Sequence, residues 1–239
     1  MKILKTVNLT KVYGTDETAV RALDSVNLEV MRGEFVAVVG TSGSGKSTML
    51  HMIGGLDKPT SGEVIVDGRT LGDMNEEELT IFRRRNIGFV FQQYNLIPML
   101  NVWENVVLPV KLDGRKPQRE YVEMVIDTLG LSNKVSSFPN TLSGGQQQRV
   151  AIARALATKP CILLCDEPTG NLDSRTSQDV LGLLKVTSEQ FHQTIVMITH
   201  NEEIAQLADR ILQIEDGRIC AGTQICRKVA ERRNCYGEG

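Results

Sequence analysis

The chain has 239 residues, a length that suits one elaborated domain or two small subdomains and excludes a long array of domains. Hydrophobic residues make up 41% of the chain and charged residues 23%, which excludes a disordered protein, a collagen-like protein and a coiled-coil rod. With 27 basic and 29 acidic residues, the formal net charge is -2. No broad positive field is available, so we expect no nucleic-acid partner.

The five cysteines are odd in number and form no paired CxxC pattern, which predicts neither a disulfide framework nor a zinc site. No apolar run approaches the roughly 18 residues that a membrane-spanning helix needs. The N-terminus contains Lys2, Lys5 and Lys11 and has no continuous apolar segment, so it does not resemble a secretory signal. We therefore expect a cytoplasmic protein with reduced thiols.

Three segments in the first third of the chain alternate apolar and polar residues and are separated by glycines. They are Ile3 to Asn8, Val26 to Val30 and Glu63 to Asp67. A period of two is typical of strands that have one face in the core and the other in solvent. These segments predict a small antiparallel sheet.

Five short runs that contain many β-branched residues predict strands buried on both faces. They are Phe35 to Val39, Ile87 to Phe91, Ile162 to Cys165, Thr194 to Thr199 and Arg210 to Ile214. Apolar stripes with the helical period lie between them, at Val122, Val125, Ile126 and Leu129 and at Val180, Leu183, Leu184 and Thr187. This alternation predicts an α/β fold with a mainly parallel sheet.

Polar residues mark the expected helix boundaries. Asn75 with Glu78 predicts a capping box for a helix that runs through Phe82, and Asn201 precedes the acidic start of another helix. Residues 95–158 carry helical patterns and no convincing strand, so we expect an inserted helical subdomain there. The main domain is expected to cover residues 1–222, and residues 223–239 to form a polar, solvated tail.

The strand at Phe35 to Val39 leads directly into a glycine-rich segment. This segment matches the GxxxxGK[ST] pattern in the strand-to-helix context that the pattern requires, and it predicts a phosphate-binding loop. Its backbone N–H groups would face phosphate oxygens, Lys46 would reach the β- and γ-phosphates, and the Ser47 hydroxyl would hold Mg²⁺. The predicted nucleotide-binding residues are Gly40, Thr41, Ser42, Gly43, Ser44, Gly45, Lys46, Ser47 and Thr48.

A pair of carboxylates, Asp166 and Glu167, follows the buried run Ile162 to Cys165. Ligands of open parallel sheets bind at the carboxyl ends of the strands, which places this pair beside the phosphate loop. Asp166 is then expected to hold Mg²⁺ through water, and Glu167 to orient or deprotonate the attacking water. Without the phosphate loop, the pair would be an ordinary acidic turn.

A second glycine-rich helix start contains Ser143, Gly144, Gly145 and Gln146 and is followed by the helical segment VAIARALA. Unpaired N–H groups and the helix dipole make such a start a potential anion site. One triphosphate does not need two anion sites from one chain. The residues alone leave open whether this segment binds an anion or is only a glycine-flanked helix start.

Five motifs occur in the same order as in the ATP-binding subunits of ABC transporters, and the chain resembles this family over nearly its whole length. They are the phosphate loop, LSGGQ from Leu142, LLCDEP from Leu163, NLD at Asn171 to Asp173, and His200 after TIVMIT. The resemblance implies a P-loop NTPase core with a small antiparallel β subdomain and an inserted helical subdomain. It also implies that the protein binds ATP with Mg²⁺ and hydrolyses the ATP.

The resemblance assigns roles to further residues. Tyr13 is similar to the aromatic residue that stacks on adenine, and Gln92 to the glutamine that senses Mg²⁺ and the transmembrane partner. Two copies are expected to meet head to tail, with each phosphate loop facing the LSGGQ segment of the other copy. The implied catalytic residues are Glu167, His200 and Lys46; the implied metal ligands are Ser47, Gln92 and Asp166; and Asp173 is implied to link the two sites of the dimer.

Three longer sequence segments narrow the resemblance to one group within the family. The segments ETAVRALDSVNLEV, FRRRNIGFVFQQYNLIPMLNVWENVVLP and DEPTGNLDS resemble MacB-like and LolD-like ATPases of macrolide efflux and lipoprotein release. Antimicrobial-peptide resistance systems and a cell-division regulator are related to this group. The resemblance implies an integral membrane permease as partner, a location on the inner face of the cell membrane, and ATP-driven mechanotransmission. It leaves the substrate and the direction of movement open.

Two other function classes stay open at this stage. One is a non-transport ABC ATPase, acting in membrane-linked signalling or cell division, or on DNA or the ribosome. The DNA and ribosome types normally have a long coiled-coil insertion, tandem ATPase domains or a basic face, and this sequence has none of these. The other class is a P-loop small-molecule kinase, which would transfer phosphate to an added acceptor instead of water.

Four further features have less specific interpretations. His51 and His192 are expected to have structural or solvent-exposed roles, and the arginine run 83–85 to form a solvated helix face. Trp103 suits either packing or the docking of a partner helix.

Overall fold

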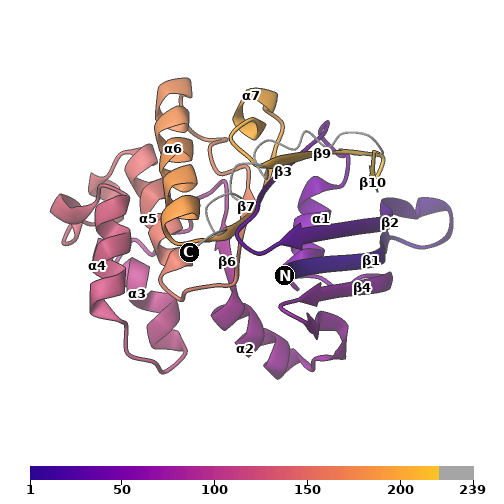
Figure 1. The fold of residues 1–239 in the computed structure, drawn as a ribbon, viewed down its shortest axis with the longest axis horizontal. Helices are drawn as coiled ribbons and strands as arrows, with labels where there is room; N and C mark the ends of the chain where they lie inside the picture. Colours follow the sequence, from indigo (N-terminus) through magenta and orange to yellow (C-terminus); the bar gives the residue numbers. More distant parts are fainter. Residues whose placement is uncertain (221–239) are drawn as a thin grey trace, which may run out of the picture.

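The computed structural model describes residues 1–220, except for the side chains of Glu17, Glu202 and Glu203. The polar tail expected at residues 223–239 lies outside the described residues. Figure 1 shows two sheets with helix α1 (Lys46–Ile53) between them, and a group of helices on the far side of the larger sheet. Within residues 1–220, no helix is both long enough and apolar enough to span a membrane.

The larger sheet has the strand order β10-β9-β3-β8-β7-β6. Its strands are β3 (Phe35–Val39), β6 (Ile87–Val90), β7 (Ile162–Asp166), β8 (Thr194–Thr199), β9 (Arg210–Glu215) and β10 (Arg218–Ile219). The neighbouring strands are parallel except for the short edge pair of β9 and β10. Every residue of β3 and β8 is buried, as expected for strands covered on both faces. The predicted α/β fold with a mainly parallel sheet is confirmed.

The smaller sheet is antiparallel, with the order β2-β1-β4-β5. Its strands are β1 (Lys2–Tyr13), β2 (Val20–Met31), β4 (Ser61–Val66) and β5 (Arg69–Thr70). Strands β1 and β2 have 12 residues each and are longer than the alternation predicts. Register shifts accompany left-handed backbone at Asn8 and Ser25, and such bulges interrupt the period of two. Asp67 also has a positive φ and belongs to the turn after β4.

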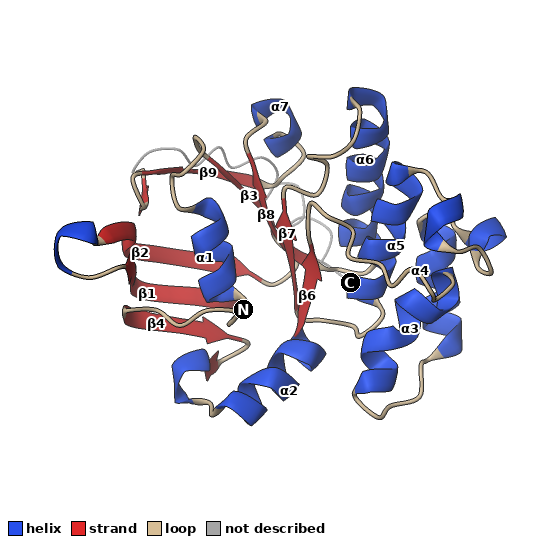
Figure 2. Cartoon of the chain, turned by 180° about the vertical axis from the view of Figure 1, so that it is seen from behind, coloured by secondary structure: helices blue, strands red, loops and turns tan. Residues whose placement is uncertain are grey.

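The remaining helices surround the larger sheet (Figure 2). They are α2 (Glu76–Asn86), α3 (Val102–Leu112), α4 (Arg119–Thr128), α5 (Gly144–Leu156), α6 (Ser174–Gln190) and α7 (Glu202–Ala205). The capping box of Asn75 and Glu78 starts α2 as predicted, although the helix continues four residues beyond Phe82. A second capping box, Asn101 with Glu104, starts α3. Helices α3, α4 and α5 occupy the stretch between β6 and β7, where no strand was expected.

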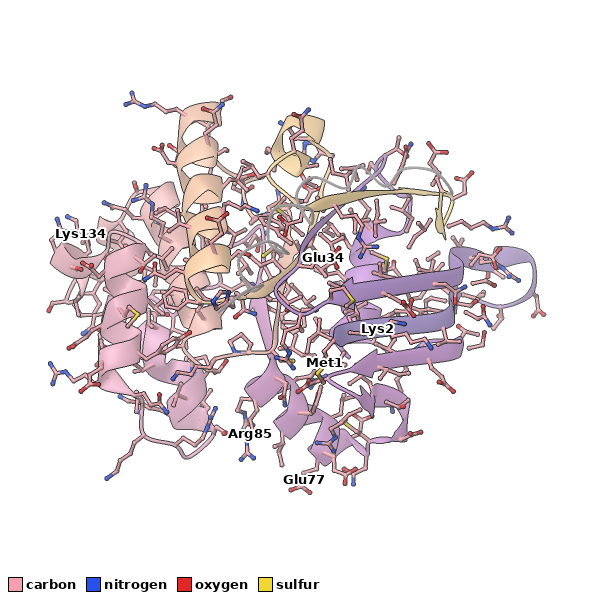
Figure 3. All side chains as sticks on the ribbon, viewed as in Figure 1. Met1, Lys2, Glu34, Glu77, Arg85 and Lys134 are labelled. Carbon is pink, nitrogen blue, oxygen red and sulfur yellow. The ribbon has the colours of Figure 1, made fainter. Side chains whose placement is uncertain are left out.

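The arginine run 83–85 is not simply a solvated helix face. Arg84 and Arg85 both bond Asp113, which follows α3, and Arg115 joins the same carboxylate at 2.6 Å. The Asp113 side chain is only 1% exposed. Burial raises its pKa, but the neighbouring arginines outweigh burial and hold the pKa below its usual range. Figure 3 shows Arg85 on α2, the helix that this ion-pair cluster ties to the end of α3.

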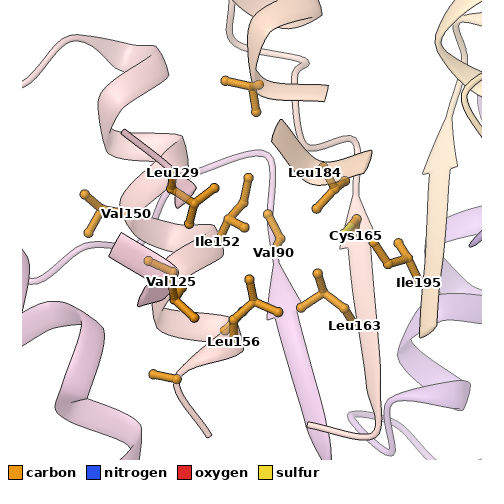
Figure 4. Packing of buried hydrophobic residues seen from close by; sticks show 14 of the residues in the cluster. Val90, Val125, Leu129, Val150, Ile152, Leu156, Leu163, Cys165, Leu184 and Ile195 are labelled. Atoms are coloured by element: carbon orange, nitrogen blue, oxygen red, sulfur yellow. The ribbon is translucent and has the colours of Figure 1, made fainter. Parts of the chain in front are cut away.

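Alternate residues of the larger sheet face two separate cores. Val36 and Val38 of β3 pack with α1 and the smaller sheet, whereas Phe35 and Ala37 pack with helices α3 to α6. Figure 4 shows the second core, where Leu163 of β7 lies among side chains of β6 and α5. Because both faces are covered, the carboxyl-terminal edge of the parallel strands is the part of the sheet that can carry a site.

Candidate nucleotide site

Three adjacent parallel strands deliver the predicted groups to one edge of the sheet. Strand β3 ends before the phosphate loop, β7 ends at Asp166, and β8 ends immediately before His200. A cavity of about 370 Å³ opens at this edge. It is lined by Ala22, Ser42, Gly43, Gly45, Lys46, Ser47, Thr48, Glu167 and His200.

The phosphate loop requires glycine at Gly45, which begins α1 as its N-cap. Gly45 has φ +101°, in the region that favours glycine. A Cβ atom at this position would lie 2.3 Å from the carbonyl oxygen of Ala22 on β2. The absence of a side chain lets the loop lie against β2 while the first amides of α1 stay directed toward the cavity.

Lys46 is held inside the loop by two main-chain carbonyl groups. Its ammonium group donates to the carbonyl oxygens of Gly40 and Thr41 at 2.8 and 2.7 Å, and the residue is 7% exposed. Within residues 1–220, no carboxylate forms a salt bridge with this ammonium group, and its hydrogen bonds go to the two loop carbonyls. The positive charge is therefore available to an anion that enters the loop.

Ser47 and Asp166 provide the oxygen pair expected of a magnesium site. The Ser47 hydroxyl lies 3.4 Å from the Asp166 carboxylate and donates to it. Hydroxyl and carboxylate oxygens suit Mg²⁺, which usually keeps several waters and substrate phosphates as its other ligands. Residues 1–220 contain no cluster of three or more His, Cys, Asp or Glu that would hold a metal ion by itself. The donor set therefore fits a magnesium ion that arrives with the nucleotide.

Burial raises the pKa of Asp166, and the nearby Glu167 charge adds to this effect, while His51, Ser47 and Lys46 oppose it. A carboxyl group whose folded pKa is raised destabilises the fold at pH values above that pKa, and this cost disappears as the pH falls. We expect Asp166→Asn to raise the melting temperature of the nucleotide-free protein by about 1–3 °C at pH 7, with a smaller gain in acid. Differential scanning calorimetry at two pH values measures this.

Asp166→Asn should also reduce the rate of ATP hydrolysis, because an amide is a weaker ligand for a divalent cation than a carboxylate. Asp73→Asn, at an exposed carboxylate in the segment before α2, is the control for loss of one negative charge. A melting temperature that falls in Asp166→Asn and stays constant in Asp73→Asn would contradict a destabilising charge at Asp166.

Glu167 and His200 form a hydrogen-bonded pair in the cavity. The Nδ1 atom of His200 lies 3.1 Å from Oε1 of Glu167, and the Glu167 side chain is 26% exposed. Glu167 has φ +43°, a left-handed conformation that is uncommon for a residue with a side chain. Its backbone N–H donates to the carbonyl of Ile198 at the end of β8, which fixes this turn beside the strand that precedes His200. Backbone strain of this kind is often found at functional sites.

Gln92 lies at the edge of the site, outside the residues that line the cavity. Its side-chain amide donates to Oδ1 of Asn171 at 3.2 Å, and the Asn171 amide donates back to the Gln92 carbonyl at 3.0 Å. The described structure therefore joins the predicted metal-sensing glutamine to the NLD motif instead of to Ser47 or Asp166.

The LSGGQ segment forms a helix start, as its sequence predicts. Ser143 is the N-cap of α5, and a reciprocal capping box joins it to Gln146. Gly144 and Gly145 occupy the first helical turn, where backbone N–H groups have no partner within the helix. Gly145 packs against Thr176 of α6 so closely that a Cβ atom would lie 2.3 Å from that side chain. None of these four residues lines the cavity of the phosphate loop.

Asp173 is the N-cap of α6 and accepts bonds from the backbone N–H and the hydroxyl of Thr176. The backbone hydrogen bond from Thr176 is the main reason why the pKa of Asp173 is lowered. Tyr13 lies at the end of β1, where its hydroxyl donates to Asp57. Asp173 and Tyr13 also lie outside the cavity lining.

Two contributors could not be found from the sequence. Ala22 lines the cavity from β2, and an alanine in an alternating strand carries no functional signal. Asn171 belongs to a motif that the sequence identified, but its bonds to Gln92 join positions 79 residues apart. Only the folded arrangement of the sheet edge reveals that pair.

Comparison with known proteins places this geometry in a family. A sequence profile described as ABC transporter matches residues 23–170. The chain is 48% identical to the uncharacterized ABC transporter ATP-binding protein MJ0796 of Methanocaldococcus jannaschii, over 91% of this chain and 95% of that protein. A solved dimeric structure of that cassette, in a post-hydrolysis state with ADP and Pi, has a TM-score of 0.80 at 46% identity, covering 91% of this chain and 96% of the other.

Two named groups are also similar. The lipoprotein-releasing system ATP-binding protein LolD of Psychrobacter arcticus is 44% identical over 90% of this chain and 96% of its own length. The macrolide export ATP-binding/permease protein MacB of Bdellovibrio bacteriovorus is 43% identical over 87% of this chain, a match that spans only 32% of MacB. These matches and the ordered motifs lead to one assignment: the chain belongs to the ABC transporter family, as an ATP-binding cassette of the group that includes LolD and the ATP-binding part of MacB.

Proposed function

We propose that this protein is the ATP-hydrolysing subunit of a LolD- or MacB-like transporter and that it works as a head-to-tail dimer. One observation carries the proposal: the phosphate loop, Glu167 and His200 line one cavity, while the LSGGQ segment lies outside it. The free amides of Gly144 and Gly145 thus have no phosphate to bind within their own chain. A second copy would bring that segment to the phosphate loop. The dimeric MJ0796 cassette with ADP and Pi supports this arrangement.

The residues of the cavity suit phosphoryl transfer to water. Lys46 would exchange its bonds to loop carbonyls for bonds to the β- and γ-phosphates, while the amides at the start of α1 neutralise phosphate charge. Glu167 would accept a proton from the water that attacks the γ-phosphorus, as the bond between that phosphorus and the ADP oxygen breaks. His200 would hold Glu167 in place and reach the γ-phosphate. A magnesium ion held by Ser47, Asp166 and Gln92 would supply further charge neutralisation.

ATP would join the two copies, because its phosphates are shared by a phosphate loop and the facing LSGGQ segment. Loss of the γ-phosphate removes contacts that belong to both chains, so hydrolysis would favour the open dimer. Gln92 would link this cycle to the permease, since its bonds to Asn171 connect it to the segment that leads to Asp173.

The segment from Asn95 to Val107 is the proposed contact with the permease, which would hold the ATPase at the inner face of the membrane. Met99 in this segment is 86% exposed and Ile97 is 40% exposed, although Trp103 packs partly against the helical core. Exposed apolar residues on a loop are typical of surfaces that bind a partner.

The permease assignment can be tested by affinity purification of the chain from membranes solubilised in mild detergent. We expect an integral membrane protein to co-purify with the wild-type chain, and Met99→Asp to reduce the recovered complex by about tenfold. Met124→Asp, at a 49% exposed methionine on α4, is the matched control and should retain the complex. Equal recovery with both variants would contradict the proposed contact, and phosphate transfer to an acceptor other than water would contradict the ATPase itself.

A further inference from the structure

The Tyr13 side chain is held from two directions at the end of β1. Its hydroxyl donates to Oδ2 of Asp57 at 2.9 Å. The ammonium group of Lys11 lies over one face of the ring, 4.9 Å from the ring centroid. The residue nevertheless remains 42% exposed. A tyrosine that is this exposed and still fixed at both its hydroxyl and one face has little freedom to rotate.

Asp57 and Lys11 are themselves anchored. Lys11 donates to Oδ1 of Asp57 at 2.8 Å and to the carbonyl of Lys58 at 2.6 Å, and its side chain is only 13% exposed. The Lys58 N–H donates to the same Asp57 oxygen. The backbone of Val12 is bonded to the Thr60 hydroxyl, which ties β1 to this turn after α1. The residues that support the Tyr13 ring are therefore themselves fixed by hydrogen bonds to the turn after α1.

Charge keeps this arrangement in place at neutral pH. The hydrogen bond from Lys11 holds the pKa of Asp57 below its usual value, so Asp57 is an ionised acceptor. Burial and the Asp57 carboxylate together raise the pKa of Tyr13, so the phenol keeps the proton that it donates. The hydroxyl of Thr48, in the first turn of α1, also acts on Tyr13 and opposes that increase. Thr48 lines the cavity of the phosphate loop, so the Tyr13 side chain adjoins a residue of that cavity.

We infer that Asp57 and Lys11 are positioning residues for the nucleotide base: they hold the Tyr13 ring in one orientation, with Lys11 on one face and the opposite face left for adenine. This inference rests on the proposed ATPase function and on Tyr13 as the stacking residue. A mobile tyrosine would lose rotational freedom each time a base stacked on it, whereas a fixed ring has already lost that freedom on folding. The arrangement thus strengthens binding of the base without contact with the reacting phosphates.

The inference predicts a change in KM at constant kcat. Tyr13→Phe keeps the ring but removes the hydroxyl, and we expect KM for ATP to rise about three- to tenfold, with kcat within about twofold of the wild type. Asp57→Ala should give at least as large a rise, because it also removes the anchor of Lys11. The double variant should add little to Asp57→Ala, because the bond between Tyr13 and Asp57 is already lost in that variant. The dissociation constant of inorganic tripolyphosphate, which has no base, should not change in any of them.

Three comparisons keep the inference separate from the function on which it rests. Absence of ATP hydrolysis by the wild type would overturn the ATPase function. If the wild type hydrolyses ATP but Tyr13→Ala leaves KM unchanged, Tyr13 is not the base platform and the inference fails. If Tyr13→Ala raises KM but Tyr13→Phe does not, the ring acts without the support of Asp57 and the inference fails also. Glu29→Ala is the matched control, because it removes an exposed carboxylate paired with Lys2 at the other end of the β1–β2 hairpin.

Discussion

Replacing Glu167 with glutamine is expected to slow ATP turnover by about 10²-fold or more while ATP binding remains intact. The amide has nearly the same shape as the carboxylate and can keep a hydrogen bond to His200, which lies 3.1 Å away in the wild type. It cannot accept a proton from water. The lost function is therefore the chemical step, and the phosphate loop is unchanged.

Because hydrolysis would no longer separate the two copies, the Glu167→Gln protein should accumulate as an ATP-bound dimer. Size-exclusion chromatography with light scattering, in the presence and absence of ATP, measures this directly. Glu63→Gln, at an exposed carboxylate on β4, is the matched control and should turn over ATP at the wild-type rate. Normal turnover by Glu167→Gln would remove Glu167 from its proposed role.

Ser143→Arg should have a comparably large effect for a different reason. A long cationic side chain at the start of α5 would occupy the space that the other copy's phosphates need, so we expect the steady-state ATPase rate to fall by about 10²-fold. Binding of a fluorescent ATP analogue by the monomer should be retained, because Ser143 does not line the cavity of its own phosphate loop. The specific activity of the wild type should rise with protein concentration, and that of the variant should not.

Ser143 also caps α5, so the variant loses a helix cap as well, at a cost of about 1 kcal/mol in folding stability. Asn75→Arg provides the control for this loss, since Asn75 and Glu78 form the same kind of capping box on α2. Equal ATPase rates for Ser143→Arg and Asn75→Arg would show that the cap, and not a shared site, explains the effect. A wild-type rate for Ser143→Arg would refute the shared site outright.

The strands of the larger sheet could be predicted because their signal is local. Every residue of β3 and β8 is buried, so in neither strand do polar residues alternate with apolar ones. The phosphate loop could be predicted for a similar reason, since its glycines and Lys46 are contiguous. Because ligands of parallel sheets bind at the carboxyl ends of the strands, Asp166 and Glu167 could also be placed at the same edge of the sheet as the phosphate loop.

Features that depend on contacts between distant segments could not be predicted in this way. The bond from Tyr13 to Asp57 spans 44 residues, and the bonds between Gln92 and Asn171 span 79. The alternation of apolar and polar residues predicts β1 and β2 too short, because bulges near Asn8 and Ser25 shift the alternation from one face of the sheet to the other. The capping box at Asn101 and Glu104 is an exception, because its sequence signature is the same as that of α2 and could have been used.

The left-handed backbone at Glu167 has a consequence for protein engineering. A glycine or asparagine adopts this conformation more readily than a glutamate, by about 1 kcal/mol. A library screened only for survival of heating would therefore enrich chains that carry such replacements at this position. Those variants would stay folded at higher temperature but would not hydrolyse ATP. Any selection for thermostable variants of this cassette must therefore also select for ATP hydrolysis in every round.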